Sequence, residues 1–367
     1  MKKILYVVST LKSAGPTNQL SYIIKYLDKK KFDPTILTLS PESTDSRKNY
    51  FEDVLNVKVE TLGLSRIKGF IYAKTKVKRF IDDNCIDIVH SQGFRADGII
   101  HKLNAVSTVA TLRNYPFYDN TMTYGQFRGY LMAKIHLYYL RHIDYPIVVS
   151  KSISKLLSKK NNFDISYIQN GVDIEKFKDI DKSKLRKKLN IKDGEKIFIS
   201  VGTLDSRKDP ITIIKAFIKA KIKSSKLILL GNGYLIKECQ NEIGQNKNIM
   251  LIGNVDNVKE YLGASDYFVS SSLAEGLPNA VLEAMICGLP CILSNIPPHS
   301  ELVEIGDKFS NLFEVKNIEM LVNIFKSLND HEYNKMSLAG KNIILEHLNA
   351  HKMSKKYQNV YSELVGS

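Results

Sequence analysis

Two glutamates, Glu275 and Glu283, are separated by seven residues and lie on either side of a Gly- and Pro-containing turn. Glu275 follows an apolar strand-like run, Tyr267–Ser270, and Glu283 lies in the helix-like stretch that the turn opens. A helix N-terminus offers free backbone N–H groups and a partial positive charge, which suit phosphate or sugar oxygens. A carboxylate further along that helix can accept hydrogen bonds from ribose hydroxyls. The spacing therefore predicts a site that holds both ends of a nucleotide-sugar.

A second segment places cations after another strand-like run. Gly202 follows the apolar residues 197–201, and Arg207 and Lys208 come shortly before a helix-like stretch that starts at Pro210. A glycine lets the backbone approach a ligand, an arginine can bind a diphosphate through two N–H groups, and a lysine adds a compact charge. The alternative is a solvated basic loop.

The string EGLPNAVLEAMICGLPCILS, which contains both glutamates, resembles the signature of the retaining glycosyltransferases of family 4. This resemblance covers nearly the whole chain. It implies the GT-B fold, in which two doubly wound Rossmann-like domains face each other across a cleft, and transfer of a sugar from a nucleotide diphosphate, expected to be UDP, to a glycan acceptor. A lipid-linked acceptor and a role in bacterial surface polysaccharide synthesis, such as lipopolysaccharide or capsule, fit the same resemblance.

The resemblance also implies roles for single residues. Arg207 and Lys208 neutralise the leaving diphosphate, Glu275 orients and stabilises the sugar, and Glu283 holds the ribose. The turn between the glutamates contacts the donor through Gly276, Leu277, Pro278 and Asn279. Further donor contacts are expected from glycine or asparagine in strand-end loops, namely Gly15, Gly202, Gly231 and Asn254.

The loop after the first strand departs from the family pattern. Ala14 stands where a glycine is usual, and Pro16 after Gly15 has no N–H to offer a phosphate. Asn18 or Gln19 can therefore contact the acceptor or the sugar instead. An ordinary strand-to-helix turn is the alternative.

A second departure concerns the strand that ends in His90-Ser91-Gln92. Family members often have histidine at the position of Gln92, and glutamine can bond a sugar hydroxyl but cannot carry a proton in catalysis. We expect Gln92 to position the sugar while the leaving phosphate accepts the acceptor's proton. His90 is assigned to the catalytic set, with a structural strand-end histidine as the alternative.

Arg113 and Asn114 follow the next strand-like run. A fixed cation there suits an anionic acceptor or a lipid diphosphate, so Asn18, Arg113 and Asn114 are the expected acceptor-binding residues. A salt-bridged loop arginine is the alternative for Arg113.

Strand-like runs alternate with helix-like stretches throughout, which predicts α/β architecture with parallel sheets. Ligands of such folds bind outside the carboxyl ends of the strands. We expect an acceptor domain over residues 1–168, completed by a crossover helix at about 346–367 within a helical segment 342–364, and a donor domain over residues 169–345. The Asn170-Gly171 turn is a hinge candidate. The expected strands are residues 4–9, 34–39, 57–61, 86–90, 107–111, 145–150, 196–201, 226–230, 249–252, 267–270 and 290–293.

Charge is uneven along the 367 residues. Residues 1–165 hold 26 Lys and Arg against 14 Asp and Glu, whereas residues 166–367 hold 27 against 24. A basic half indicates an anionic surface or partner. Basic, periodically apolar stretches at 66–81 and 124–141 can lie on an anionic bilayer or bury their apolar stripe in the core. We expect a cytoplasmic enzyme, associated peripherally with the inner face of the membrane.

Other functions are less well supported. The chain lacks a G-x-G-x-x-G fingerprint, a phosphate-binding P-loop and an Asp-x-Asp metal motif at the expected cleft, so we expect metal-independent chemistry without a cofactor. The four scattered cysteines are expected to be reduced. A GT-B sugar-nucleotide epimerase would need acid and base groups at the sugar, which Gln92 does not supply. A basic nucleic-acid-binding protein would show its own motifs, and none is found.

Overall fold

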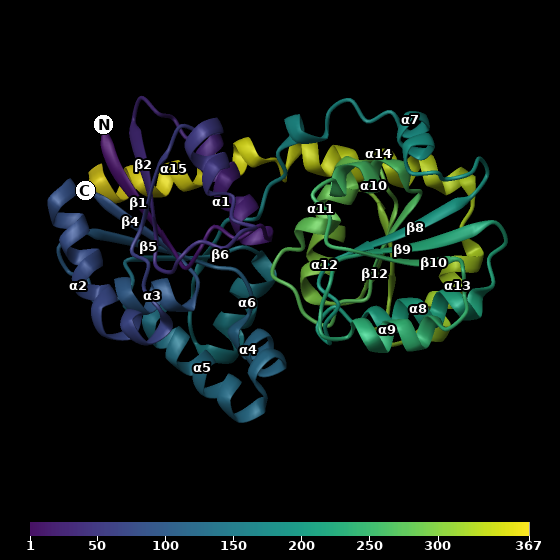
Figure 1. Cartoon of the computed structure of the whole chain (residues 1–367), viewed down its shortest axis with the longest axis horizontal. Helices are drawn as coiled ribbons and strands as arrows, with labels where there is room; N and C mark the ends of the chain where they lie inside the picture. The colour runs from purple at the N-terminus through teal and green to yellow at the C-terminus, as the bar shows by residue number, and fades with distance from the viewer. Residues whose placement is uncertain (367) are drawn as a thin grey trace. The chain divides into compact units, whose positions relative to one another are not determined.

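The computed structural model describes residues 1–366, with the side chains of residues 66–68, 70 and 330 outside the description. The chain forms two compact units (Figure 1). Unit 1 comprises Met1–Gly171 and the segment from Ala350 onward, and unit 2 comprises Val172–Asn349. The expected crossover helix at 346–367 reaches one residue beyond the described part.

Unit 1 is built on a parallel seven-stranded sheet in the order β3-β2-β1-β4-β5-β6-β7. The order reverses beside β1, so the carboxyl ends of β1 and β4 flank the point where doubly wound folds bind ligands. The strands are β1 (Lys2–Val8), β2 (Phe32–Thr38), β3 (Lys58–Thr61), β4 (Ile88–Gln92), β5 (Ser107–Leu112), β6 (Tyr145–Val148) and β7 (Ser166–Tyr167).

Crossover helices connect these strands and cover the sheet. They are α1 (Gly15–Lys25), α2 (Arg66–Asn84), α3 (Phe94–Ile100), α4 (Pro116–Tyr124), α5 (Gln126–Leu140) and α6 (Lys151–Asn161). The C-terminal helix α15 (Ala350–Gly366) returns to unit 1, where it packs against α1 (Figure 1). Its Tyr357 and Tyr361 are fully buried in the core of that unit, and the Tyr361 hydroxyl lies 3.2 Å from that of Tyr6.

Unit 2 holds a parallel six-stranded sheet in the order β10-β9-β8-β11-β12-β13. Its order reverses beside β8, so β8 and β11 flank the switch point. The strands are β8 (Lys196–Val201), β9 (Ser225–Leu230), β10 (Ile249–Gly253), β11 (Tyr267–Ser270), β12 (Cys291–Ser294) and β13 (Ser310–Phe313). The helices are α7 (Lys182–Lys188), α8 (Pro210–Ala220), α9 (Ile236–Ile243), α10 (Val258–Ala264), α11 (Asn279–Ile286), α12 (Pro297–Val303), α13 (Ile318–Ser327) and α14 (Asp330–Glu346).

The strand and helix prediction is wrong at four elements. The short strands β7 and β13 were not expected, and the strand expected at 145–150 stops at Val148 because Ser150 caps α6 through its hydroxyl, which accepts from the N–H of Ile153. The expected helix over 342–364 is interrupted at residues 347–349. There the carbonyl of Leu348 accepts a hydrogen bond from the Val172 N–H, 2.9 Å away, in a short β-bridge.

Both basic stretches form helices with a buried and an exposed apolar side. In α2, Ala73 and Val77 are fully buried, whereas Ile71 and Tyr72 are more than half exposed. Within the described part of the chain, no helix combines the length and apolarity that a membrane crossing requires.

Candidate functional site

The topology of unit 2 brings two charged loops together. β8 and β11 are neighbours in the sheet, with Phe198 beside Tyr267, so the loops that leave their carboxyl ends start side by side. The Leu273 N–H donates to the Arg207 carbonyl at 2.7 Å, and the Ser271 hydroxyl donates to the carbonyl of Lys208 at 3.0 Å. These bonds fasten the loop after β11 to the loop after β8.

Three charged side chains meet where these loops touch, and we call Arg207, Lys208 and Glu275 the charged cluster. The Arg207 guanidinium donates to Glu275 Oε2 at 3.1 Å, and the Lys208 ammonium donates to Oε1. The Ser272 hydroxyl also donates to Oε1, at 2.7 Å. The Glu275 side chain is 7% exposed and the two cations are 20% exposed each. Two mostly buried cations held beside one carboxylate suit an anionic ligand.

The electrostatics of Glu275 follow from this arrangement. Burial by itself raises the pKa of the carboxyl, but Lys208 and Arg207 outweigh burial and lower the pKa to about 2. Glu275 is therefore a permanent anion that fixes both cations in place, and it is not a proton donor at neutral pH.

This low pKa predicts how the stability of the protein depends on pH. The folded pKa lies below the ordinary value of 4.5, so the contribution of Glu275 to stability is present above that value and is lost as pH falls towards 2. The contribution is on the order of 3 kcal/mol. We expect Glu275→Gln to lower the free energy of unfolding at pH 7 and the deficit to shrink below about pH 4.5. Urea unfolding of both proteins at several pH values measures this, and a deficit that does not change with pH would contradict the pairing.

Glu283 has a different environment. It is the fifth residue of α11 and is half-buried, and burial raises its pKa while Lys176 partly offsets that rise. Among the described residues its carboxylate forms no recorded hydrogen bond or ion pair. Of the four charged residues expected to bind the donor, the structure brings Arg207, Lys208 and Glu275 into contact. Glu283 lies in the same unit, where its carboxylate is available to a ligand.

The glycines at the strand ends of unit 2 pack against one another. Gly231 has a φ of +130°, and a Cβ placed on it would lie 1.9 Å from the carbonyl oxygen of Gly202. Its N–H donates to the Gly253 carbonyl at 2.8 Å. Close loop packing is therefore one reason for these glycines. A contact between the donor and Gly202, Gly231 or the exposed Asn254 stays a prediction. The same is true of Gly15, which lies at the start of α1, and of Gly276–Asn279, the turn that leads into α11.

In unit 1, Arg113 is held by amides rather than by a carboxylate. β4 and β5 are neighbours with Gln92 beside Thr111, so Arg113, two residues later, reaches Gln92. Its guanidinium donates to Gln92 Oε1 at 2.7 Å and to Asn170 Oδ1 at 3.0 Å. Within the described residues it has no ion pair, so the alternative of a salt-bridged loop arginine is wrong.

Half-buried Arg113 and its neighbour Gln92 each have a side-chain N–H group without a hydrogen-bond partner in the described part of the chain. The Nε of Arg113, and the side-chain nitrogen of the 8%-exposed Gln92, are buried without a hydrogen-bond partner among the described residues. Burial lowers the pKa of the guanidinium, although arginine stays charged at neutral pH. Unsatisfied donors around an uncompensated cation favour an anionic ligand here.

The structure contradicts the catalytic role expected of His90. The side chain is fully buried, and its two ring nitrogens bond to the Tyr361 hydroxyl at 2.7 Å and to the Thr111 hydroxyl at 2.8 Å. Burial lowers its pKa to about 3. These contacts favour the alternative of a structural histidine, because His90 fastens α15 to the sheet and both of its ring nitrogens are taken.

Other polar residues of unit 1 also have structural partners. Gln19 is buried and exchanges hydrogen bonds with the backbone of Gly171, which contradicts the expected ligand contact. Asn18 accepts a hydrogen bond from Arg47, and the amide of Asn114 donates to Asp119 at 3.1 Å. A role of Asn18 or Asn114 in acceptor binding stays a prediction.

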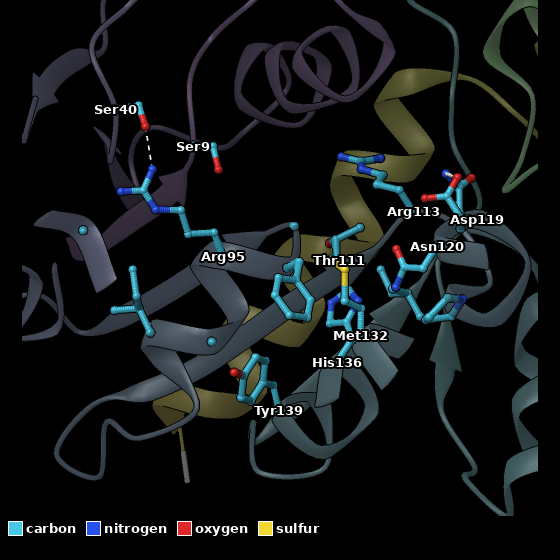
Figure 2. A pocket seen from close by; sticks show the side chains of 18 of the residues that line it. Ser9, Ser40, Arg95, Thr111, Arg113, Asp119, Asn120, Met132, His136 and Tyr139 are labelled. Atoms are coloured by element: carbon cyan, nitrogen blue, oxygen red, sulfur yellow. Dashed lines mark hydrogen bonds between the residues drawn. The ribbon is translucent and has the colours of Figure 1, made fainter. Parts of the chain in front are cut away.

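A cavity of about 1200 Å³ opens in unit 1 beside Arg113 and Asn114. Figure 2 shows Arg95 at one side, with its bond to Ser40, and Arg113, Asp119 and Asn120 at the other. Lys74 and Lys102 add two more cations, and Phe94 and Tyr139 add aromatic surface. No sequence motif marks Arg95 or His136 as cavity residues. The basic excess of this half of the chain is the signal that points to the cavity.

Comparison with known families identifies the fold. Residues 14–176 match the model named Glycosyltransferase Family 4, and residues 181–343 match the model named Glycosyl transferases group 1. The O-antigen biosynthesis glycosyltransferase WclY of Escherichia coli is 30% identical, over 99% of this chain and 98% of the relative. The chain belongs to the family 4 glycosyltransferases of GT-B fold.

Two further similarities bear on this family 4 glycosyltransferase. An Escherichia coli relative named UDP-Gal:alpha-D-GlcNAc-diphosphoundecaprenol alpha-1,3-galactosyltransferase is 34% identical over 55% of this chain and 54% of the relative. The crystal structure of Anabaena Alr3699/HepE in complex with UDP and glucose aligns with a TM-score of 0.83 at 18% identity, over 99% of this chain and all of that one. The second likeness concerns the fold alone.

Proposed function

We propose that this enzyme transfers a sugar from a UDP-linked donor, with retention of configuration, to a lipid-linked glycan during synthesis of a bacterial surface polysaccharide. The observation that carries the proposal is the charged cluster of Arg207, Lys208 and Glu275 at the switch point of unit 2. The names of relatives that act in O-antigen synthesis and on diphosphoundecaprenol acceptors support the biological setting.

In this proposal unit 2 binds the donor. Lys208 and Arg207 stabilise the negative charge that develops on the leaving diphosphate, and Glu275 fixes their positions. The turn Gly276–Asn279 contacts the sugar, and Glu283 accepts hydrogen bonds from the ribose. Because positioned cations take the leaving charge, no metal is required.

Unit 1 binds the acceptor. Arg113, with Gln92 and Asn114 beside it, contacts the anionic group of the acceptor, and the 1200 Å³ cavity holds the glycan. Gln92 cannot accept the proton of the attacking hydroxyl. The leaving phosphate accepts it, so the bond between the anomeric carbon and the phosphate oxygen breaks as the bond to the acceptor oxygen forms on the same face.

Enzyme assays with defined substrates test this proposal. A thermal-shift screen with UDP-, GDP- and dTDP-sugars identifies the donor, and transfer to a short-chain GlcNAc-diphosphoprenol is then followed with and without EDTA. We expect stabilisation by a UDP-sugar and an α-linked product whose rate EDTA does not change. Conversion of the UDP-sugar without acceptor would indicate the epimerase instead, and an inverted linkage would contradict retention.

The helical hairpin α4–α5 of unit 1 supports membrane association. Phe127 is 83% exposed, and Tyr130 and Leu131 are each 52% exposed. Exposed aromatic and apolar side chains beside cations such as Arg128 and Lys134 suit the interface of an anionic bilayer. We therefore place the enzyme at the cytoplasmic face of the membrane, where a lipid-linked acceptor would be presented.

This placement gives a prediction. The double variant Phe127→Ser, Tyr130→Ser is expected to lower partitioning onto phosphatidylglycerol vesicles by about tenfold or more, since each aromatic side chain contributes about 1.5–3 kcal/mol when buried. Co-sedimentation measures the partitioning. Leu338→Ser, at an equally exposed leucine of unit 2, is the control and should bind as wild type does. Equal binding by all three proteins would contradict membrane docking through this hairpin.

A further inference from the structure

A buried network in unit 1 aims one histidine at the cavity. Asp97 of α3 is fully buried, and its two carboxylate oxygens are taken by the Ser91 hydroxyl at 2.5 Å and by His136 Nε2 at 2.7 Å. A buried carboxylate is costly unless it is hydrogen-bonded, and these partners satisfy it. Asp97 therefore fixes the imidazole of His136, on α5, with Nε2 as the protonated nitrogen.

The second ring nitrogen of His136 is left for a ligand. His136 lines the 1200 Å³ cavity, and its side chain is 8% exposed. Nδ1 has no hydrogen bond among the described residues, and it is not fully buried. With the ring proton on Nε2, Nδ1 is a hydrogen-bond acceptor.

The surroundings keep the ring in this orientation. The Phe94 ring meets that of His136 edge to face, with centroids 5.3 Å apart and planes at 81°. His136 lines the cavity together with Met132 and Thr111 (Figure 2). Ser91 bonds to Asp97 and not to the histidine, so the three residues do not form the serine–histidine–carboxylate relay of a hydrolase.

The cavity combines four cations with acceptors such as the Asp119 carboxylate and the hydroxyl and amide oxygens of Ser9 and Asn120. Arg95, Lys74, Lys102 and Arg113 can bond to phosphate or carboxylate oxygens but cannot accept a proton from a hydroxyl. A ligand that carries both an anionic group and a hydroxyl fits this cavity. The cations bind the anionic group, and the oriented Nδ1 of His136 accepts a hydrogen bond from the hydroxyl.

We propose that His136, oriented by Asp97, is an acceptor-binding residue whose Nδ1 accepts a hydrogen bond from a sugar hydroxyl of the acceptor. This assignment rests on the proposed function, because the cavity must be the acceptor site. It gives the enzyme a contact that distinguishes glycan acceptors bearing a hydroxyl at the matching position from those that lack it.

Two substitutions at one position separate this role from a structural one. His136→Gln places an amide nitrogen near the Nε2 position, where it can still donate to Asp97, but removes the Nδ1 acceptor. His136→Asn places an amide oxygen near the Nδ1 position but loses the bond to Asp97. His142→Gln, at an exposed histidine after the end of the same helix, is the control.

We expect His136→Gln to raise KM for a short-chain GlcNAc-diphosphoprenol by about ten- to a hundredfold, with KM for the UDP-sugar and the rate of UDP-sugar hydrolysis within twofold of wild type. His136→Asn should recover part of the acceptor affinity, and His142→Gln should match wild type. Thermal unfolding checks that each variant is folded.

The outcomes distinguish the two proposals. Acceptor KM unchanged in a folded His136→Gln protein would overturn the role of His136 while leaving glycosyl transfer intact. Equal loss of donor and acceptor kinetics in both His136 variants would indicate a structural role and would also overturn it. Absence of any transfer in the wild-type protein would instead refute the proposed function.

Discussion

Lys208→Ala is expected to lower kcat for sugar transfer by about 10²–10³-fold, because a positioned charge that stabilises the leaving group contributes this much in other enzymes. The ammonium bonds to Glu275 in the resting structure, and burial of this pair makes the charge more effective than it would be in water. Steady-state kinetics with saturating donor and acceptor measure the loss. KM for the donor should change less than kcat does.

A matched control separates the effect of position from that of charge. Lys215 lies in α8 of the same unit and forms an exposed ion pair with Glu242, so Lys215→Ala removes the same charge without touching the charged cluster. It should keep wild-type kinetics, since exposed ion pairs contribute little. A kcat within twofold of wild type for Lys208→Ala, in a folded protein, would refute the assigned role.

Glu283→Ala is expected to raise KM for the donor by about ten- to a hundredfold with little change in kcat. The carboxylate would bind the ribose equally in the ground state and the transition state, and loss of such uniform binding affects KM alone. Hydrogen bonds to a charged group contribute about 1.5–3 kcal/mol, which sets the size of the effect. Glu242→Ala removes a surface carboxylate of the same unit and is the control.

A modified donor tests the ribose contact itself. Wild-type enzyme should use a 2′-deoxy or 3′-deoxy UDP-sugar less well than the UDP-sugar, and Glu283→Ala should discriminate less between them. If the variant penalises the deoxy donors as strongly as wild type does, Glu283 does not bind the ribose, whatever its effect on KM.

The sequence predicted the loops of the charged cluster, for a physical reason. Arg207, Lys208 and Glu275 each follow a parallel strand, and in doubly wound sheets strand ends converge at the switch point. The sequence does not reveal that β8 and β11 are neighbours in the sheet, because β9 and β10 lie between them in the sequence. The pairing of both cations with Glu275, and hence its lowered pKa, could be learned only from the structure.

Tertiary contacts explain where prediction failed. The sequence places His90 at a strand end, which predicts an accessible side chain, but Tyr357 and Tyr361 of the distant helix α15 cover it. His136 lies 39 residues from Asp97, so no local pattern marked the pair. The break at residues 347–349 depends on a backbone bond to Val172, which helix periodicity does not reveal.

Calorimetric titration with UDP tests the central claim most directly, because it measures nucleotide diphosphate binding at the charged cluster without knowledge of the sugar or the acceptor. We expect UDP to bind wild-type protein and the Lys215→Ala control equally, and the double variant Arg207→Ala, Lys208→Ala at least tenfold more weakly. UDP affinity unchanged in that folded double variant would contradict the account.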